Sequence, residues 1–521
     1  MSRALRLLVT VSALLCVALP ARAAPAAALE RGAAIIDPPA LRELDGGRFS
    51  LARMLWPERS TDLPLTNSQL FALPSMTPVR AALDAEFDRY IEKHKASLPN
   101  ETIGIGEGSA FQLFDRSQLY SPDARFVLAG IVNRMDRGYV DAASCGEIRL
   151  IYRLTRTDAA STGYNAAAPR LPMTLNLVLK AKGDGAIDRE GKPITCGDIA
   201  RRWLAISELS LTGKELADKL LGPDGPLDLV DYQNIDRIET NLQIAHAPKS
   251  AVRDFRTDYL LKVFNYDQTA RRFEEAPLEN QIDRDRILAD DHLRREFKSW
   301  LLAHFGELDR GTILIPEKFL ARGAIAPTPA GFDASDLQPE FGLVQGETSA
   351  AEPVFNEADV VAALKKAAED GTKLQNIRSI AGFERRLNDI TCSGCHQTRG
   401  IGGFHFPGVD WMAAKPSNST VVPASPHFFG DQVRRRDILG ALRDGKSPDY
   451  SRGFSSRPQL RGSTELAGTE YDDGWGAHCY LPGAKAADND KSFRTWTCAE
   501  GLACQVAAKS SRIGMCFVKN R

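Results

Sequence analysis

Apolar and polar residues follow two different periods along the first part of the chain, up to about residue 325. Apolar runs rich in β-branched and aromatic residues predict strands at 126–132, 148–154, 173–179, 259–264 and 312–315. Apolar residues at helical spacing predict amphipathic helices at 78–94, 199–209, 211–221 and 290–305. Several predicted strands follow one another without a helix between them. This order favours an α+β fold with a mixed, mainly antiparallel sheet over a doubly wound parallel sheet.

The pattern changes after this region. Residues 323–353 are rich in Pro, Gly, Ala and Ser, which is typical of a linker or an irregular crossing segment. Helices are predicted again at 357–370 and 430–445, and the tail from about residue 470 is loop-like and rich in cysteine. We therefore expect an α+β domain of unknown activity, a linker, a small helical domain and a disulfide-rich module, at 24–325, 326–356, 357–460 and 461–521.

The first 23 residues have the pattern of a secretory signal peptide. Arg3 and Arg6 precede an apolar run of thirteen residues, and Ala21–Arg22–Ala23 has the small residues of a cleavage site. The apolar run is short for a membrane span, so an uncleaved anchor is the weaker interpretation. We expect a periplasmic or secreted protein with no integral membrane segment once residues 1–23 are removed.

Composition narrows the class of partner. The formal net charge of the 521-residue chain is −1, with 43% hydrophobic and 26% charged residues. Because the charge is nearly balanced and no long basic run occurs, the sequence shows no basic surface of the kind that binds nucleic acid. A chain of this length and apolar content is expected to form two or three domains with real cores.

Eight cysteines remain after the signal peptide, an even number that favours pairing in an exported chain. Cys145 and Cys196 stand alone in the N-terminal region, so by elimination we pair them. The last four cysteines allow three connectivities, of which we favour the interleaved pairs Cys479–Cys504 and Cys498–Cys516. A metal site made by these four is the alternative, although their spacing does not suit zinc.

The remaining two cysteines lie in Cys392-Ser-Gly-Cys395-His396. This stretch resembles the haem-attachment motif of c-type cytochromes, strongly over these five residues and weakly over 357–445 through the flanking helices. The resemblance implies haem c, with both cysteines bonded to the haem vinyl groups and His396 as the proximal iron ligand. It also implies a cytochrome c-like fold for the helical domain at 357–460.

The sixth iron ligand stays open at the level of sequence. The candidates are His405, Met412 and His427. Methionine would raise the haem potential, whereas a second histidine would lower it. A five-coordinate iron would instead favour ligand binding or peroxide chemistry.

Two other interpretations of the motif are open. In an exported protein Cys392 and Cys395 form a short-loop disulfide if no cofactor is attached. A zinc site made by these two cysteines with His396 and His405 is the other alternative, although adjacent residues fit poorly around one tetrahedral ion.

The N-terminal region has one dense polar cluster next to its strands, made of Asn133, Arg134, Asp136, Arg137, Glu147 and Arg149. These side chains would line a cleft at the strand ends. The alternation of Glu147 and Arg149 favours the plainer interpretation, a solvated ion-pair ladder on one strand face. No nucleophile elbow and no His-Glu-x-x-His motif occurs, so the catalytic residues are unknown.

These observations favour an exported c-type haem protein that carries out electron transfer or redox chemistry coupled to its N-terminal domain. The partner would be a redox protein or a small-molecule substrate. The alternatives are a secreted, cofactor-free binding or structural protein with a Cys392–Cys395 disulfide, and a hydrolase whose active site lies in the N-terminal domain.

Overall fold

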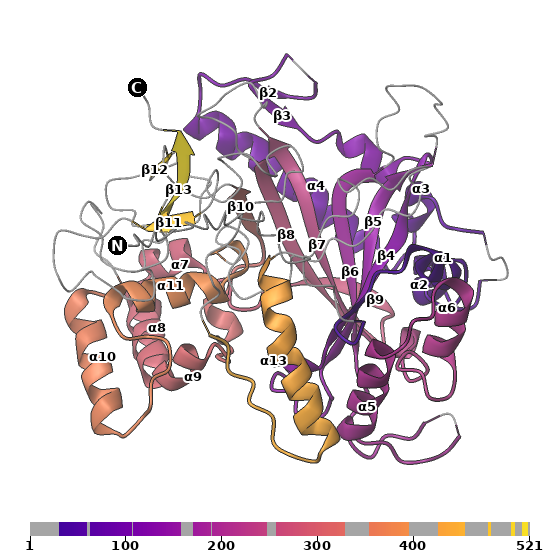
Figure 1. Ribbon diagram of the computed structural model, residues 1–521. Coiled ribbons are helices and arrows are strands. Elements are labelled where there is room, and N and C mark those ends of the chain that lie inside the picture. Colours follow the sequence, from indigo (N-terminus) through magenta and orange to yellow (C-terminus); the bar gives the residue numbers. More distant parts are fainter. Residues whose placement is uncertain are drawn as a thin grey trace, which may run out of the picture.

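The computed structural model (Figure 1) describes most of the chain. The described residues are 31–59, 63–106, 108–157, 170–188, 190–246, 257–328, 354–394, 426–453, 478–480, 497, 502–505 and 513–518. The predicted signal peptide lies outside these residues. Among the helices within them, none is both long enough and apolar enough to cross a membrane.

A large sheet forms the centre of the molecule (Figure 1). Its central strands pair antiparallel in chain order: β4 (Ala124–Arg134), β5 (Glu147–Arg156), β6 (Arg170–Lys180), β7 (Ile235–His246) and β8 (Thr257–Asp267). Shorter strands extend it: β1 (Ala34–Ile35) on β4, β9 (Arg272–Ala276) and β10 (Ala324–Thr328) on β8, and β3 (Phe111–Leu113) on β7. Only β2 (Ile103–Gly104) pairs parallel, with β3, among the described strands. The predicted, mainly antiparallel sheet is confirmed.

Helices before and between the strands cover this sheet. They are α1 (Pro38–Gly46), α2 (Leu51–Leu55), α3 (Asn67–Leu70), α4 (Thr77–Ser97), α5 (Cys196–Ser207) and α6 (Gly213–Leu221). Their apolar faces share one core with β4 to β8, in which Trp203 and Phe87 are fully buried. The core forms because the helical and strand periods of the sequence both turn apolar side chains toward the same layer.

A second core lies beside the sheet and is made by short helices. These are α7 (Arg284–Ala289), α8 (Asp291–Ala303), α9 (Phe305–Arg310), α10 (Glu357–Glu369) and α11 (Ile380–Ile390). They come from both sides of the predicted linker. Phe305 of α9 stacks on Phe383 of α11 with ring centroids 5.8 Å apart, and Asp309 accepts hydrogen bonds from backbone N–H groups, including that of Ile377. The helical segment therefore packs against chain that precedes the linker, while the domain boundaries stay predictions.

The strand predicted at 312–315 is wrong. This segment is buried at Ile313 and Ile315, but it pairs with no neighbouring strand. The Asn280 side chain replaces the strand partner, since its Nδ2 donates to the Ile313 carbonyl at 2.9 Å and its Oδ1 accepts from Ile315 N at 2.8 Å. One amide side chain thus satisfies the backbone groups that a ladder would otherwise satisfy.

The tail contains a small antiparallel sheet, made of β11 (His478–Tyr480), β12 (Leu502–Gln505) and β13 (Ile513–Val518). The described part of the tail is therefore strand rather than the expected loop.

Candidate functional site

The cysteine–histidine motif begins in a buried helical turn. After α11 ends, the chain resumes a helical turn over 392–394, in which Cys392 is only 7% exposed. Cys392 joins an apolar cluster from β8, β9, β10 and the segment after β9, which contains Leu261, Val263, Ala276, Leu278, Ala324 and Ala326. The turn therefore presses the first motif cysteine against the edge of the large sheet.

Hydrogen bonds to described residues help to fix this turn. Ser393 N donates to Gln281 Oε1 at 2.9 Å, and Cys392 Sγ donates to the Glu279 carbonyl at 3.5 Å. Gly394 N donates to Thr391 Oγ1 at 2.9 Å, which caps the turn from within. The segment that links β9 to α7 thus holds the start of the motif.

The other predicted haem residues lie outside this description. Cys395, His396, His405 and Met412 fall between 394 and 426, outside the described residues. His427 falls in the first turn of α13 (Pro426–Arg443), and its side chain is not among those described.

The polar cluster predicted at the strand ends is a buried ion-pair network. Glu147 on β5 contacts Arg137 at 3.0 Å, Arg149 at 2.9 Å and Arg237 at 2.9 Å, and Arg149 Nη1 donates to Glu239 Oε2 at 2.9 Å. None of these five side chains is more than 14% exposed. The expected solvated ladder is therefore wrong: Glu147 and Arg149 do pair, but the pair is inside the protein.

A second half of the network surrounds Asp136, which lies in the short 3₁₀ turn Met135–Arg137 after β4. Asp136 accepts from Arg134 Nε at 2.8 Å, Arg434 Nη2 at 2.9 Å and Arg452 Nη2 at 3.0 Å. Asp431 pairs in turn with Arg434. Through these bonds α13 docks onto the end of β4, although nearly 300 positions separate them in the sequence.

The acids of the network stay ionised. Burial alone would raise the pKa of Asp136, but Arg134, Arg435 and Arg452 outweigh it and hold that pKa well below its ordinary value. Burial acts in the same direction on Glu147, and Arg137 with other arginines again holds the pKa of that carboxyl well below its usual range.

The network and the motif are neighbours. Arg137 Nη1 donates to Glu279 Oε1 at 3.1 Å, and the carbonyl of the same Glu279 accepts from Cys392. A second link runs through α11, whose Arg386 donates to the carbonyl oxygens of Asp309 and Arg452 at 2.8 Å each. The two regions singled out in the sequence are thereby brought together.

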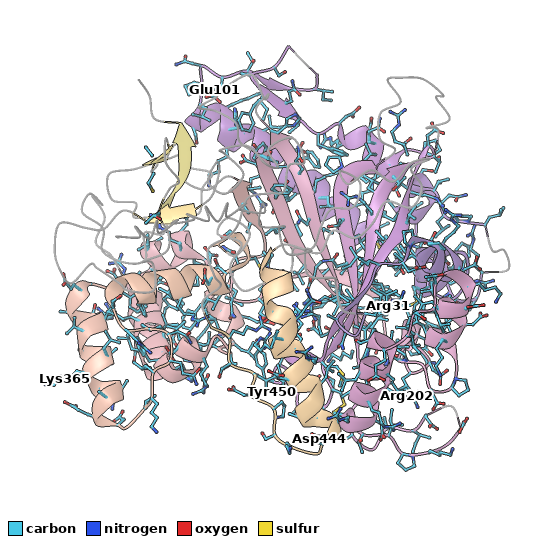
Figure 2. The ribbon with its side chains drawn as sticks, viewed as in Figure 1. Arg31, Glu101, Arg202, Lys365, Asp444 and Tyr450 are labelled. Carbon is cyan, nitrogen blue, oxygen red and sulfur yellow. A yellow bond between two sulfur atoms is a disulfide. The ribbon has the colours of Figure 1, made fainter. Side chains whose placement is uncertain are left out.

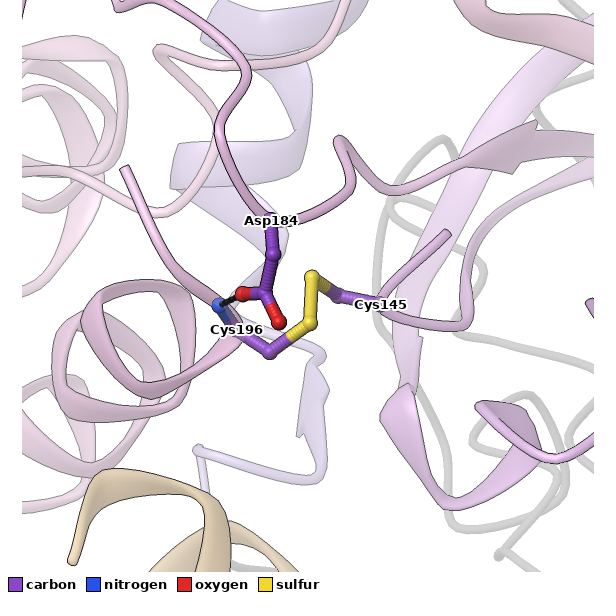
Figure 3. A group of neighbouring side chains, drawn as sticks. All are labelled: Cys145, Asp184 and Cys196. Carbon is purple, nitrogen blue, oxygen red and sulfur yellow. Dashed lines mark hydrogen bonds between the residues drawn. A yellow bond between two sulfur atoms is a disulfide. The ribbon is translucent and has the colours of Figure 1, made fainter. Parts of the chain in front are cut away.

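The predicted Cys145–Cys196 disulfide is confirmed, with the two Cα atoms 5.3 Å apart. Figure 3 shows Asp184 beside it, where Asp184 Oδ1 accepts from Cys196 N at 2.6 Å. The three side chains place ligand-type atoms within 4.8 Å of one another. Because the two sulfurs are bonded to each other, this group is a crosslink and not a metal site in the oxidised protein. It ties the chain just before β5 to the first turn of α5.

In the tail, Cys504 is disulfide-bonded. In the register of β12 and β13 it lies opposite Cys516. The pairs Cys479–Cys504 and Cys498–Cys516 stay predictions.

Hollows flank the network on the side of α5. A partly open cavity of about 10 Å³, enough for about one water, is lined by Asn133, Asp136, Gln432 and Arg435 among others. Outside it, an open groove of about 780 Å³ runs between α5 and α13. The alternative interpretation of the cluster, a cleft at the strand ends, does not hold either, because α13 packs against Asp136 there.

Sequence reasoning missed half of the network, namely Arg237, Glu239, Glu279, Asp431, Arg434, Arg435 and Arg452. One signal was present: Arg434, Arg435 and Arg436 form a run of three arginines within a predicted helix. A run of three covers nearly a full turn, so at least one member must face the protein.

No family model matches this chain, and neither a curated protein nor a solved structure shows significant similarity to it.

Proposed function

We propose that this chain is an exported c-type haem protein in which haem c is attached through Cys392 and Cys395, with His396 as the proximal iron ligand. Its role is electron transfer or redox chemistry with a partner protein or a small molecule that the N-terminal region binds. The observation that carries the proposal is the placement of Cys392 on a helical turn, against an apolar sheet edge and next to a buried network of arginines.

The described residues fit such a group. A helical turn is the conformation in which two cysteines separated by two residues can meet both vinyl groups of one porphyrin. The apolar cluster around Cys392 is buried, so it would surround the first thioether position with non-polar side chains. When bound, the haem would supply one-electron transfer.

The protein residues would orient the group and set its electrostatic surroundings. Gln281 and Thr391 hold the turn that carries the first thioether position. Glu279 and Arg137 pair next to it, and both keep their charge at neutral pH. Arg137 lowers the pKa of Glu279, whose side chain is 38% exposed, whereas Glu147 and Glu279 raise the pKa of the buried Arg137. Fixed charges beside a haem tune its potential.

The predicted signal peptide supports the proposal, since covalent haem attachment takes place outside the cytoplasm in bacteria. The Cys145–Cys196 disulfide is compatible with an oxidising compartment.

The test is a visible spectrum and a haem-stained denaturing gel of the protein exported from cells with a cytochrome c maturation system. We expect a Soret band and haem that survives denaturation. The double variant Cys392→Ala/Cys395→Ala should lose both signals, while Cys145→Ala/Cys196→Ala should keep the haem stain. A colourless wild-type protein would instead favour a secreted protein with a Cys392–Cys395 disulfide.

A further inference from the structure

Two guanidinium groups meet on one carboxylate oxygen in the network. Arg434 Nη2 donates to Asp136 Oδ2 at 2.9 Å, and Arg452 Nη2 donates to the same atom at 3.0 Å. Arg434 lies on α13 and Arg452 lies on the segment after it. The shared acceptor therefore holds two like charges side by side.

Each of these two arginines has a further buried donor that is not used. Arg434 Nη1 and Arg452 Nε are shielded from solvent, and neither has a hydrogen-bond partner within the described part of the chain. The side chains are only 18% and 9% exposed. Buried charged N–H groups are almost always satisfied in folded proteins, so two such groups on neighbouring arginines point to a missing acceptor.

The balance of charge around Asp136 also indicates a missing negatively charged group. Among the described residues, four guanidinium groups pair with only two carboxylates, those of Asp136 and Asp431, and a third carboxylate, Asp449, interacts with Arg434 without an ion pair; the four belong to Arg134, Arg434, Arg435 and Arg452. Burial lowers the pKa of Arg435 to about 10, and it also lowers the pKa of Arg452. The half of the network around Glu147 has no such surplus, because Arg137, Arg149 and Arg237 face Glu147, Glu239 and Glu279.

We propose that Arg434 and Arg452 form a binding site for the carboxylate group of a small organic acid. A planar carboxylate matches the donor geometry of guanidinium groups. A singly charged carboxylate also costs less to dehydrate than a phosphate dianion, which suits donors that solvent does not reach. Tyr139 and Tyr450, with ring centroids 5.6 Å apart, lie next to these arginines, and Figure 2 shows Tyr450 beside α13.

The site does not depend on the proposed haem, because no motif residue takes part in it. A haem would nevertheless bring carboxylate groups of its own close to the network. The carboxylate therefore has two possible sources, a diffusible acid or the porphyrin, and the experiment must separate them.

The experiment is calorimetric titration of the full-length exported protein with sodium acetate, with sodium chloride and sodium phosphate at matched ionic strength as comparators. The same titration is made on the haem-free variant Cys392→Ala/Cys395→Ala. We expect saturable acetate binding that weakens at least ten-fold in Arg452→Gln and in Arg434→Lys. Arg434→Lys keeps a positive charge that can pair with Asp136, so a loss of binding in this variant is not explained by misfolding around an unpaired carboxylate. Arg436→Gln, an exposed arginine on the same helix, is the matched control and should bind acetate like the wild type.

Acetate binding by both proteins assigns the site to a diffusible acid. Binding by the haem-free variant alone assigns it to the carboxylates of the haem. The proposal is overturned if neither protein shows saturable binding, if phosphate binds more tightly than acetate, or if the two arginine variants bind as well as the control. A colourless wild-type protein that still binds acetate would end the haem proposal and leave this one standing.

Discussion

The Cys392 Sγ atom donates to the Glu279 carbonyl oxygen at 3.5 Å, although the two residues are 113 positions apart. The Glu279 side chain turns the other way and pairs with Arg137. One residue thus connects the first cysteine of the motif to the ion-pair network.

This relationship predicts an electrostatic effect on an attached haem. Glu279→Gln removes a negative charge beside the motif, which destabilises the oxidised, more positive state. We expect the midpoint potential to rise by tens of millivolts, since a unit charge about 10 Å away at an effective dielectric constant of about 20 contributes roughly 1–2 kcal/mol. Potentiometric titration measures this shift. Glu274→Gln, on an exposed acid of β9 paired with Arg272, is the control and should leave the potential nearly unchanged. Equal shifts in both variants would argue against the assigned position of the haem.

The Glu147 half of the network should be sensitive to loss of one partner. Arg149→Met leaves Glu147 and Glu239 buried with one cation fewer, and breaking a buried ion pair in this way typically costs about 3–5 kcal/mol. Lys214→Met removes an exposed pair with Asp218 and should change the unfolding free energy far less. Urea unfolding of both variants measures the difference. Similar midpoints for the two would show that solvent reaches the network.

The disulfide should stabilise the region that carries Asp136. Cys145–Cys196 closes a separation of 51 residues, for which chain entropy predicts about 4 kcal/mol. Gly146, next to Cys145, has φ +99°, and a Cβ atom there would lie 2.6 Å from Met135 Cα. The crosslink and this close contact together position the turn that holds Asp136. We expect Cys145→Ala/Cys196→Ala to lower the unfolding free energy by roughly this amount, without loss of haem stain. A much smaller loss would mean that packing alone holds the turn.

Local sequence patterns predicted the elements that have one apolar face. The helices at α4, α5, α8 and α10 and the strands β4, β5, β6 and β8 match their predicted positions closely. Strand β7 was missed for a physical reason. Its apolar residues Ile238, Leu242 and Ile244 lie on one face, where Thr240 interrupts them, and the other face carries Arg237 and Glu239 in place of apolar side chains. The alternation of apolar and polar residues that identifies a strand is therefore absent from the sequence where ion pairs, rather than apolar side chains, occupy the protein interior.

The candidate site could be predicted only in part for a related reason. The motif is contiguous, so its residue types are visible in the sequence. The network joins residues from β4, β5, β7, the segment after β9, α13 and the chain beyond it, and no local pattern encodes that assembly. Arg435 of α13, for example, is 4% exposed because it pairs with Asp431 and is attracted by Asp136, which lies about 300 positions earlier in the sequence.

A buried carboxyl elsewhere in the molecule gives the pH dependence that is easiest to measure. Asp45 at the end of α1 is 7% exposed and lines a pocket of about 320 Å³ near Arg125. Its Oδ1 accepts from Leu128 N at 3.0 Å, whereas the nearest contact to Arg125 is 3.8 Å. Burial outweighs both and raises its pKa to about 6. The folded protein therefore holds a proton on Asp45 that the unfolded chain releases at lower pH.

The sign of the resulting stability change follows from linkage. Because the folded pKa is raised, ionisation of Asp45 destabilises the folded state as the pH rises from about 4 to about 6, and the full penalty is present above that range. Asp45→Asn removes the ionisation and keeps an oxygen that accepts from Leu128 N. We expect the variant to be more stable than the wild type at pH 7.5 by up to about 3 kcal/mol, at 1.36 kcal/mol per pKa unit, and to keep only about a third of that advantage near pH 4.5. Asp218→Asn, on an exposed acid, should differ from the wild type by less than about 1 kcal/mol at both pH values. Urea unfolding at pH 7.5 and pH 4.5 measures these differences in unfolding free energy. If Asp45→Asn were more stable than the wild type by the same amount at both pH values, the Asp45 carboxyl would not titrate in this range.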